Sequence, residues 1–241
     1  EDDFNELVID LVNPAGQPER MQLVVRGYND GFAFCYKIPD GKGPCVNVQS
    51  ELTAYNFAGD YTAWFYNGEN HNIGPEKLTE TDGTRLPVMT VKAGDKHYMA
   101  IHEACLETGA PLVLQSKGGE SLFSVASKPT SLSPGYTSAW RVVLYGTTPG
   151  VLTDSHLLEL LNPDPDSRYD FSWVKPGLAV WDWRINGAVW DGFTYGMSYP
   201  SWVRMVDFAA EQGFKYLVLD ANWYGPEFES DSDPVKGEKA Q

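Results

Sequence analysis

The feature that most constrains the fold is a change of pattern at a short proline-rich segment, Asn162-Pro163-Asp164-Pro165-Asp166-Ser167. Before it, short β-rich segments alternate with Gly, Pro, Asn and Asp; after it, apolar segments alternate with one amphipathic helix. Such a composition is typical of an exposed domain boundary. We therefore expect two domains, residues 1–165 and residues 166–241.

The first domain reads as β-structure throughout. Its predicted strands are short and rich in β-branched and aromatic residues: Phe4–Val12, Met21–Arg26, Phe32–Ile38, Ser50–Ala54, Tyr61–Tyr66, Leu86–Val91, His97–His102, Leu112–Gln115, Leu122–Ala126 and Ala139–Tyr145. Tyr28-Asn29-Asp30-Gly31 predicts a tight hairpin turn. One short helix is expected at Asp154–Leu161, where leucines share a face. This pattern predicts an all-β sandwich.

The second domain begins as strand, helix, strand. Leu178–Trp183 and Lys215–Asp220 are continuously apolar strands, and Ser201–Gln212 carries an apolar stripe of helical period. A glycine-rich loop is expected over Asn186–Ser198 and a loop or unstructured tail over Glu227–Gln241. Continuously apolar strands joined by a helix predict a βαβ unit in a parallel sheet.

Charge and composition exclude several classes of protein. The formal net charge is −15 and no Lys/Arg run exists, whereas a nucleic-acid partner needs a basic surface. No apolar run reaches the length of a membrane span. Three cysteines, Cys35, Cys45 and Cys105, have no metal-type spacing. Pairing of Cys35 with Cys45 and free buried thiols both remain open, and no histidine pattern indicates zinc.

Several stretches, in order, resemble glycoside hydrolase family 97. They are Val25-Arg26-Gly27-Tyr28-Asn29-Asp30-Gly31-Phe32-Ala33-Phe34-Cys35-Tyr36, His102-Glu103-Ala104, Ser138-Ala139-Trp140-Arg141-Val142-Val143, Asp170-Phe171-Ser172-Trp173-Val174-Lys175-Pro176-Gly177 and Val206-Asp207-Phe208-Ala209-Ala210-Glu211-Gln212-Gly213-Phe214-Lys215-Tyr216. The resemblance is carried by the ordered set of these stretches.

The resemblance implies a fold and an activity that composition and periodicity do not show. The fold is a mutarotase-like supersandwich followed by the first βαβ unit of a (β/α)₈ TIM barrel. The activity is hydrolysis of α-linked glucosides or galactosides by two barrel carboxylates, with a calcium ion near the active site. The family contains both retaining and inverting enzymes. The expected partner is an oligosaccharide or glycoside, with no nucleic acid.

A complete barrel needs roughly 200 residues or more, and far fewer follow Leu178. We therefore expect a truncated barrel, a sandwich that lacks its first strands, and no catalytic residue in this chain. Glu1-Asp2-Asp3 is not a signal peptide. A secreted precursor that has lost one and a sequence that begins inside the protein both remain open, and the second is favoured. We expect a periplasmic or secreted protein.

Five residues are candidates for the site. By the resemblance, Glu103 reaches from the sandwich to help bind calcium; the alternative is a surface Glu at a strand end. Asp220 ends the second barrel strand, and Asn222 and Trp223 follow it, on the face where barrels gather functional residues. They and Trp183 are expected to bind substrate; packing is the alternative.

Two other functions stay open. A non-catalytic carbohydrate-binding or structural sandwich would use the aromatic residues, but it has no need of the βαβ segment. A mutarotase-like epimerase would need an acid–base pair in the sandwich, from His71, His97 or His102 with Glu51, Glu69 or Glu103. Nothing in the spacing of these residues favours the epimerase.

Overall fold

The computed structural model describes residues 3–12, 15, 18–69, 72–221, 223–233 and 235. The chain divides into two compact units, Glu1–Pro165 and Asp166–Gln241. The division falls within the proline-rich segment, whose composition cannot supply a core.

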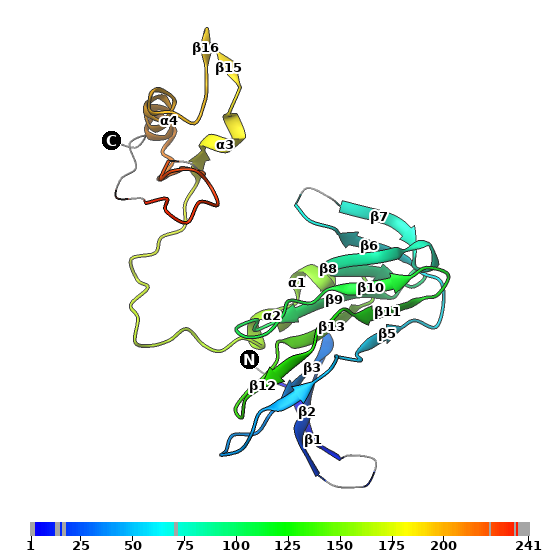
Figure 1. Ribbon diagram of the computed structural model, residues 1–241. Coiled ribbons are helices and arrows are strands. Elements are labelled where there is room, and N and C mark those ends of the chain that lie inside the picture. The colour runs from blue at the N-terminus through cyan, green and yellow to red at the C-terminus, as the bar shows by residue number, and fades with distance from the viewer. Residues whose placement is uncertain are drawn as a thin grey trace. The chain divides into compact units, whose positions relative to one another are not determined.

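The first unit is built on an antiparallel sheet of 11 strands among the described residues (Figure 1). Its strands are β1 (Asn5–Val12), β2 (Pro18–Tyr28), β3 (Gly31–Lys37), β5 (Ala54–Asn56), β6 (Thr62–Tyr66), β7 (Asn72–Lys77), β8 (Asp82–Lys92), β9 (Tyr98–Ala104), β10 (Leu114–Lys117), β11 (Leu122–Val125) and β13 (Trp140–Gly146). The order is β1-β2-β3-β13-β9-β8-β10-β11-β5, with β6 pairing β7 and β8. Two short strands, β4 (Val46–Val48) and β12 (Thr130–Leu132), pair separately.

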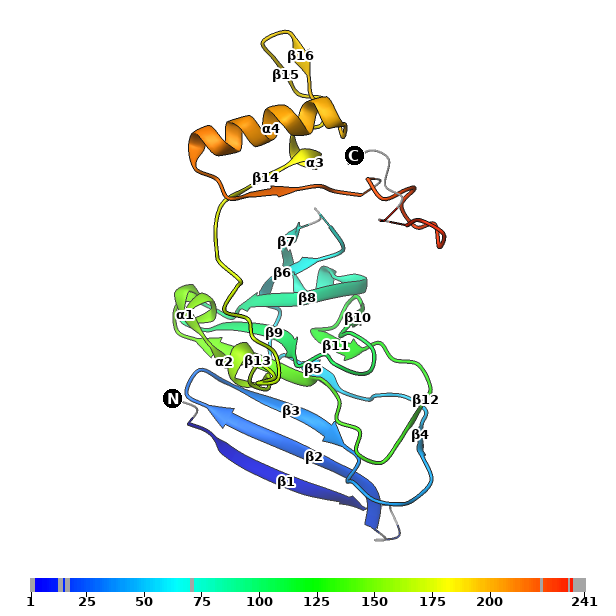
Figure 2. The same cartoon turned by 90° about the vertical axis from the view of Figure 1, so that its left-hand side faces the viewer.

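Strand β8 is long enough to belong to both layers of this sandwich. Its first half, Asp82–Arg85, pairs with β10, and its second half, Met89–Lys92, pairs with β9. Figure 2 shows β8 running from the β9–β13 layer towards β10 and β11. One strand therefore joins the two layers, and the space between them is filled by a buried cluster that includes Phe65, Met89 and Phe123.

The central pair β9–β13 separates two hydrophobic cores. On β13, Val142 and Leu144 belong to one core, while Val143 packs against the other. Leu157 and Leu161 cover the first core from outside. They lie in and just after α2 (Leu157–Leu160), which follows α1 (Pro149–Asp154). The alternation along each strand sends neighbouring side chains to opposite faces, so both faces of this sheet are buried.

The predicted hairpin at Asn29-Asp30 joins β2 to β3, with Tyr28 opposite Gly31. A Cβ atom at Gly31 would lie 2.3 Å from the Val143 carbonyl oxygen, because β13 passes close by on the other side. Glycine is required there by close packing as much as by the turn. The single helix predicted over Asp154–Leu161 is wrong in detail, since α1 and α2 are separate.

The second unit has a parallel pair at its centre, as the sequence predicted. Strands β14 (Ala179–Trp181) and β17 (Tyr216–Val218) pair in parallel. They are joined through α3 (Asp182–Ile185) and α4 (Tyr199–Gln212), and α4 packs on both strands (Figure 2). In α4 the residues Trp202, Met205 and Ala209 are buried, and Gly213 closes the helix in the left-handed conformation.

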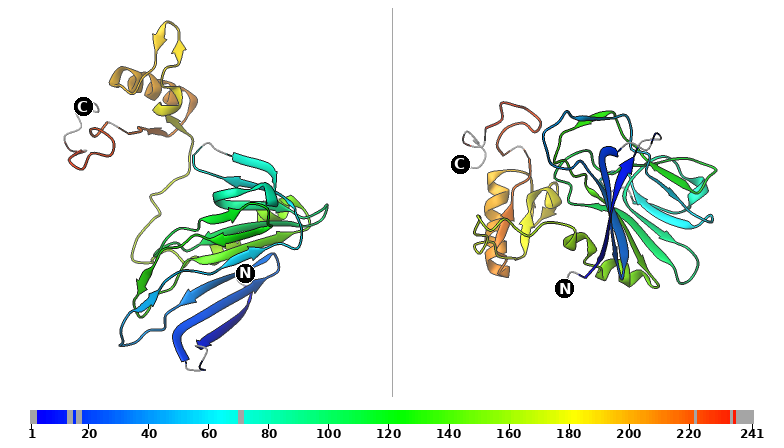
Figure 3. Two further views of the ribbon diagram at one scale, coloured as in Figure 1. Left: turned by 45° about the vertical axis from the view of Figure 1, so that its right-hand side comes forward. Right: turned by 90° about the horizontal axis from the view of Figure 1, so that it is seen from below.

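Two details of this unit differ from the prediction. The first strand ends at Trp181, not Trp183, because Asp182 turns the chain into α3. The segment predicted as a loop contains a hairpin, β15 (Val189–Trp190) with β16 (Phe193–Thr194), visible in Figure 3. Its turn, Asp191-Gly192, has positive φ at both residues, which is the Asp-Gly signal for a two-residue turn.

Candidate functional site

A charged cluster lies on the inner face of the sandwich, where β13 and β9 pair. Arg141 stands opposite Glu103 in the register. Its Nη1 donates to Glu103 Oε2 at 3.2 Å, while Nε and Nη2 donate to the two oxygens of Glu51 at 3.0 and 2.7 Å. The side chains of Arg141 and Glu103 are 6% and 10% exposed. One buried arginine thus pairs with two carboxylates at a position that water scarcely reaches.

The electrostatics of the cluster follow from burial and from pairing. Burial alone would lower the pKa of Arg141, but the hydrogen bonds and charge of Glu51 and the charge of Glu103 raise it. Burial also raises the pKa of two neighbouring phenols, Tyr55 and Tyr136. The hydroxyl of Tyr55 is buried without a hydrogen-bond partner among the residues the structure describes. With one positive and two negative groups, the cluster carries a formal charge of −1.

Glu103 is therefore not the surface residue that the alternative interpretation supposed. Its Oε2 also accepts the backbone N–H of Leu112 at 2.8 Å, which closes the loop between β9 and β10. Within the described part of the chain, no hydrogen bond engages Oε1, and no group of three or more His, Cys, Asp or Glu could hold a metal. Glu103 can supply one oxygen to a calcium ion, which takes six to eight.

A cleft of about 1090 Å³ opens beside this cluster, within the first unit. Tyr36 from β3, Glu51, Arg141 and Tyr136 line it, together with residues 108–111, 113 and 126–135. No histidine is among its lining residues. His102 and Glu103 are neighbours on β9 and leave opposite faces of the sheet. The acid–base pair needed by an epimerase is thus not formed by these residues; His71 lies outside the described residues.

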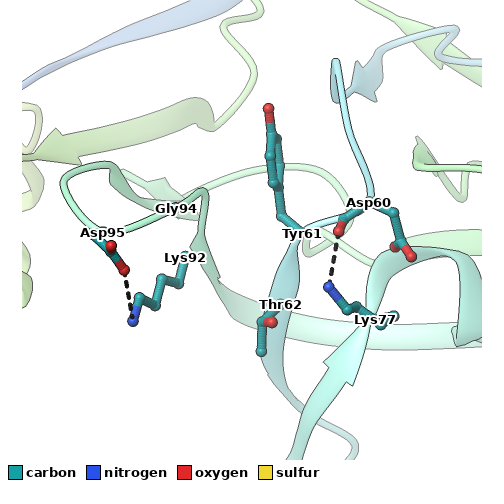
Figure 4. A pocket seen from close by; sticks show the side chains of 7 residues that line it. All are labelled: Asp60, Tyr61, Thr62, Lys77, Lys92, Gly94 and Asp95. Atoms are coloured by element: carbon teal, nitrogen blue, oxygen red, sulfur yellow. Dashed lines mark hydrogen bonds and ion pairs between the residues drawn. The ribbon is translucent and has the colours of Figure 1, made fainter.

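A second, smaller hollow of about 250 Å³ lies at the β6–β7–β8 edge (Figure 4). Lys77 Nζ donates to the Asp60 carbonyl oxygen at 3.1 Å, and Lys92 lies 4.0 Å from Asp95. The carboxylate of Asp60 accepts two hydrogen bonds from Thr79. Exposed pairs of this kind hold a turn in place and contribute little, so we assign no ligand to this hollow.

In the second unit, two aspartates sit where β14 and β17 end. Asp182 is 1% exposed. Its Oδ2 accepts the indole N–H of Trp202 at 2.8 Å, and its Oδ1 accepts the backbone N–H of Asp220 at 2.9 Å. Asp220 in turn accepts the indole N–H of Trp181 at 2.7 Å. The sequence predicts Asp220 as a substrate ligand but not Asp182 as the group that holds it.

The remaining predicted site residues are Trp183, Trp223 and Asn222. Trp183 and Trp223 are not part of the hydrogen bonds between the two aspartates and their tryptophans. Trp183 lies on α3 and is 53% exposed, and the hydrogen bonds of this region link Asp220 to Trp181 and Asp182 instead. Trp223 is half-buried and packs edge-on against Tyr224. Asn222 lies outside the described residues.

The sequence carries one signal for the cluster. Arg141 stands within the apolar run Trp140–Leu144 of a strand, and a charge in such a run requires a buried partner. Its partner Glu51 is far away in sequence, so no spacing reveals the pair.

The cysteines are free: Cys35 is buried and Cys45 is exposed, and burial raises the pKa of Cys35 to about 11. No helix in the described part of the chain is long and apolar enough to span a membrane.

An antiparallel β-sandwich with a buried charged cluster, followed by a helix-linked parallel strand pair, defines a protein that joins a sandwich to an α/β domain. A sequence model described as Glycosyl-hydrolase 97 N-terminal matches residues 1–163. The chain belongs to glycoside hydrolase family 97, which confirms the resemblance and the sandwich fold.

Two known proteins match over most of this chain. A retaining alpha-galactosidase of Bacteroides thetaiotaomicron is 28% identical over 82% of this chain and 36% of its own length. A probable retaining alpha-galactosidase of Streptomyces bingchenggensis is 30% identical over 85% of this chain and 32% of its own. This chain thus spans about a third of these relatives.

A solved structure shows the same fold. The family 97 enzyme of Pseudoalteromonas sp. strain K8, solved in complex with acarbose, has a TM-score of 0.70 at 23% identity and covers 97% of this chain and 37% of its own. Both units of the present chain are therefore included in the likeness.

Proposed function

We propose that this chain is part of a glycoside hydrolase that cleaves α-linked galactosides or glucosides. The observation that carries the proposal is family membership over the sandwich, joined to a parallel strand pair of the kind that opens a (β/α)₈ barrel. The relatives named as alpha-galactosidases point to an α-galactoside, and the neighbour bound to acarbose keeps glucosides within the class.

Hydrolysis in this class requires two carboxyl groups on either side of the scissile bond. A separation of about 5 Å places one as nucleophile and gives retention of configuration. We assign both groups to barrel residues beyond this sequence. The printed names of both relatives include retention, so we propose a retaining mechanism for the whole protein.

The residues of the present chain would bind and orient the sugar and the calcium ion. Asp220 stands at the end of β17, fixed by Trp181 and by Asp182, and each of its oxygens keeps a lone pair for a sugar hydroxyl. Trp183 and Trp223 would offer rings to the apolar face of a sugar, and Asn222 an amide. Glu103 would give Oε1 to calcium while Arg141 and Leu112 hold Oε2. When bound, calcium supplies a Lewis acid.

Activity assays test the proposal. Nitrophenyl α-galactoside and α-glucoside are offered to this chain and to a polypeptide that continues it through a complete barrel, with and without EDTA. We expect hydrolysis by the longer polypeptide alone, suppressed by EDTA, and a higher calcium requirement after Glu103→Gln. Hydrolysis by the 241-residue chain itself would show that the catalytic groups lie here and would overturn the proposal.

The location of the protein is a separate proposal. We place the protein in the periplasm or outside the cell. Fractionation of producing cells, with cytoplasmic and periplasmic marker enzymes, tests it; recovery with the cytoplasmic marker would contradict it.

A further inference from the structure

The sequence contains two Asn-Gly pairs, Asn67-Gly68 and Asn186-Gly187. All four residues are exposed, and the two glycines have positive φ, +103° and +84°. Asn-Gly pairs are common in turns for this reason. The pair can also react with itself, because a glycine has no side chain to shield its backbone nitrogen from the amide of the asparagine before it. Asparagine is accordingly one of the thermolabile residues.

The reaction at such a pair needs only water. The glycine nitrogen bonds to Cγ of the asparagine and closes a succinimide ring, and its proton leaves with the side-chain amide as ammonia. Water then breaks one of the two bonds between that nitrogen and a ring carbonyl carbon. Breakage at Cγ leaves aspartate, whereas breakage at the main-chain carbonyl carbon leaves isoaspartate, whose main chain runs through Cβ. One ammonia is released, one water is consumed, and nothing is oxidised or reduced.

Asn67-Gly68 lies in an open part of the turn that follows β6. A Cβ atom at Gly68 would meet no atom within 4 Å. Among the residues that the structure describes, the Gly68 N–H donates no backbone hydrogen bond. Ring closure at Asn67 therefore meets no steric obstacle at the glycine and breaks no hydrogen bond of its nitrogen.

Asn186-Gly187 is equally exposed, but its glycine nitrogen is bonded. The Gly187 N–H donates to the Tyr195 carbonyl oxygen at 2.9 Å, and the next N–H, of Ala188, donates to the Ile185 carbonyl oxygen at 2.9 Å. These bonds close the base of the β15–β16 hairpin on the end of α3. Ring closure at Asn186 would first have to open this base, which requires a local unfolding step.

We propose that Asn67 is a site of spontaneous deamidation, with aspartate and isoaspartate as its products, and that the hairpin protects Asn186 from the same reaction. Either product adds one negative charge, next to the exposed Glu69, to a chain that already carries −15. The inference does not depend on the hydrolysis of glycosides.

Isoaspartate would also lengthen the main chain by one carbon directly after β6. Tyr66, the last residue of β6, pairs with Asn72 of β7 and with Leu86 of β8. Among the described strands, β7 pairs with β6 alone, so no second neighbour holds it in place. The extra carbon should loosen the pairing of β7 with β6, whereas aspartate keeps the main chain unchanged and should not.

Peptide mass spectrometry measures both sites in one sample. The 241-residue chain is incubated at mildly alkaline pH, folded and in guanidinium chloride, in water enriched in heavy oxygen that labels the products formed during incubation. After trypsin cleavage the two asparagines lie in separate peptides, residues 43–77 and 185–204, and fragmentation locates the mass gain. Asn67→Gln is the matched variant, because glutamine would have to close a larger ring and reacts far more slowly.

In the folded chain Asn67 should deamidate roughly tenfold faster than Asn186, and in denaturant the two rates should agree within about twofold. Asn67→Gln should remove the mass gain at this position and leave Asn186 unchanged. Equal rates in the folded chain would overturn the protection of Asn186. A rate at Asn67 that is more than about tenfold slower in the folded chain than in denaturant would overturn the site itself.

Hydrogen exchange of the incubated chain tests the effect on the sheet. The isoaspartate form should exchange faster than the incubated Asn67→Gln variant in β7, while β9 and β13 should exchange equally in both. Unchanged exchange in β7 would overturn the loosening of this strand.

Discussion

Removal of Arg141 tests whether the buried cluster stabilises the sandwich. Arg141→Met keeps much of the length of the side chain but leaves Glu51 and Glu103, 18% and 10% exposed, without their shared partner. Removing one member of a buried ion pair costs about 3–5 kcal/mol, because the remaining charge is left uncompensated. Since Glu51 is partly reached by water, we expect Arg141→Met to lower the free energy of unfolding by the lower end of this range, about 3 kcal/mol.

The double variant separates pairing from packing. Glu103→Gln keeps an oxygen to accept the Leu112 N–H and should cost only about 1–2 kcal/mol. Combined with Arg141→Met, it removes one of the two stranded charges. The double variant should therefore be more stable than the sum of the single costs predicts, by at least about 1 kcal/mol.

Urea unfolding followed by far-ultraviolet circular dichroism, which reports on the strands of the first unit, measures these differences. Lys92→Met is the control, since its partner Asp95 is 99% exposed and a surface change should stay within about 0.5 kcal/mol. A cost below about 1 kcal/mol for Arg141→Met, or strict additivity in the double variant, would refute the reasoning.

Three further predictions concern other parts of the fold. Burial lowers the pKa of His102, against the opposing charge of Glu103. The stability that results is present above the unfolded pKa of about 6.5 and is lost as pH falls through the lower folded pKa. His102→Gln should therefore make the free energy of unfolding depend less on pH below about 6.5. Gly31→Ala should cost about 2 kcal/mol or more through the 2.3 Å approach of its Cβ to the Val143 oxygen, while Gly27→Ala, with open space around it, should not; equal urea midpoints would contradict this. Asp182→Ala should cost about 1–3 kcal/mol for each stranded donor and speed hydrogen exchange in α4; unchanged exchange there would refute a structural role.

Local patterns predicted much of the fold. Alternation and turn residues located the hairpin at Asn29-Asp30, and the apolar stripe located α4. They missed β7, which carries Gly74 and Pro75 in its middle and so lacks a strand signal. They also missed the hairpin at Asp191-Gly192, because strands of two residues are too short to show a period.

The candidate site was predicted only in part, for a physical reason. The family resemblance predicted Glu103 as a site residue. It did not predict that the Glu103 side chain is buried or that it accepts a hydrogen bond from the Leu112 backbone N–H. The pairing of Arg141 with Glu51 joins residues 90 positions apart, and the cleft is formed by loops that come together only in the folded sandwich. Contacts of this range depend on topology, which no local pattern encodes.

The two-sided burial of β9 and β13 restricts how this sequence can change in length. Because adjacent residues of β13 serve different cores, the loss of Val142 would exchange the faces of every residue that precedes it in the strand, unless a bulge absorbed the shift. Arg141 would then be turned from its two carboxylates into the apolar layer beneath α2. Substitutions can accumulate in this strand one at a time, whereas insertions and deletions are confined to the loops at its ends, where the cleft is built.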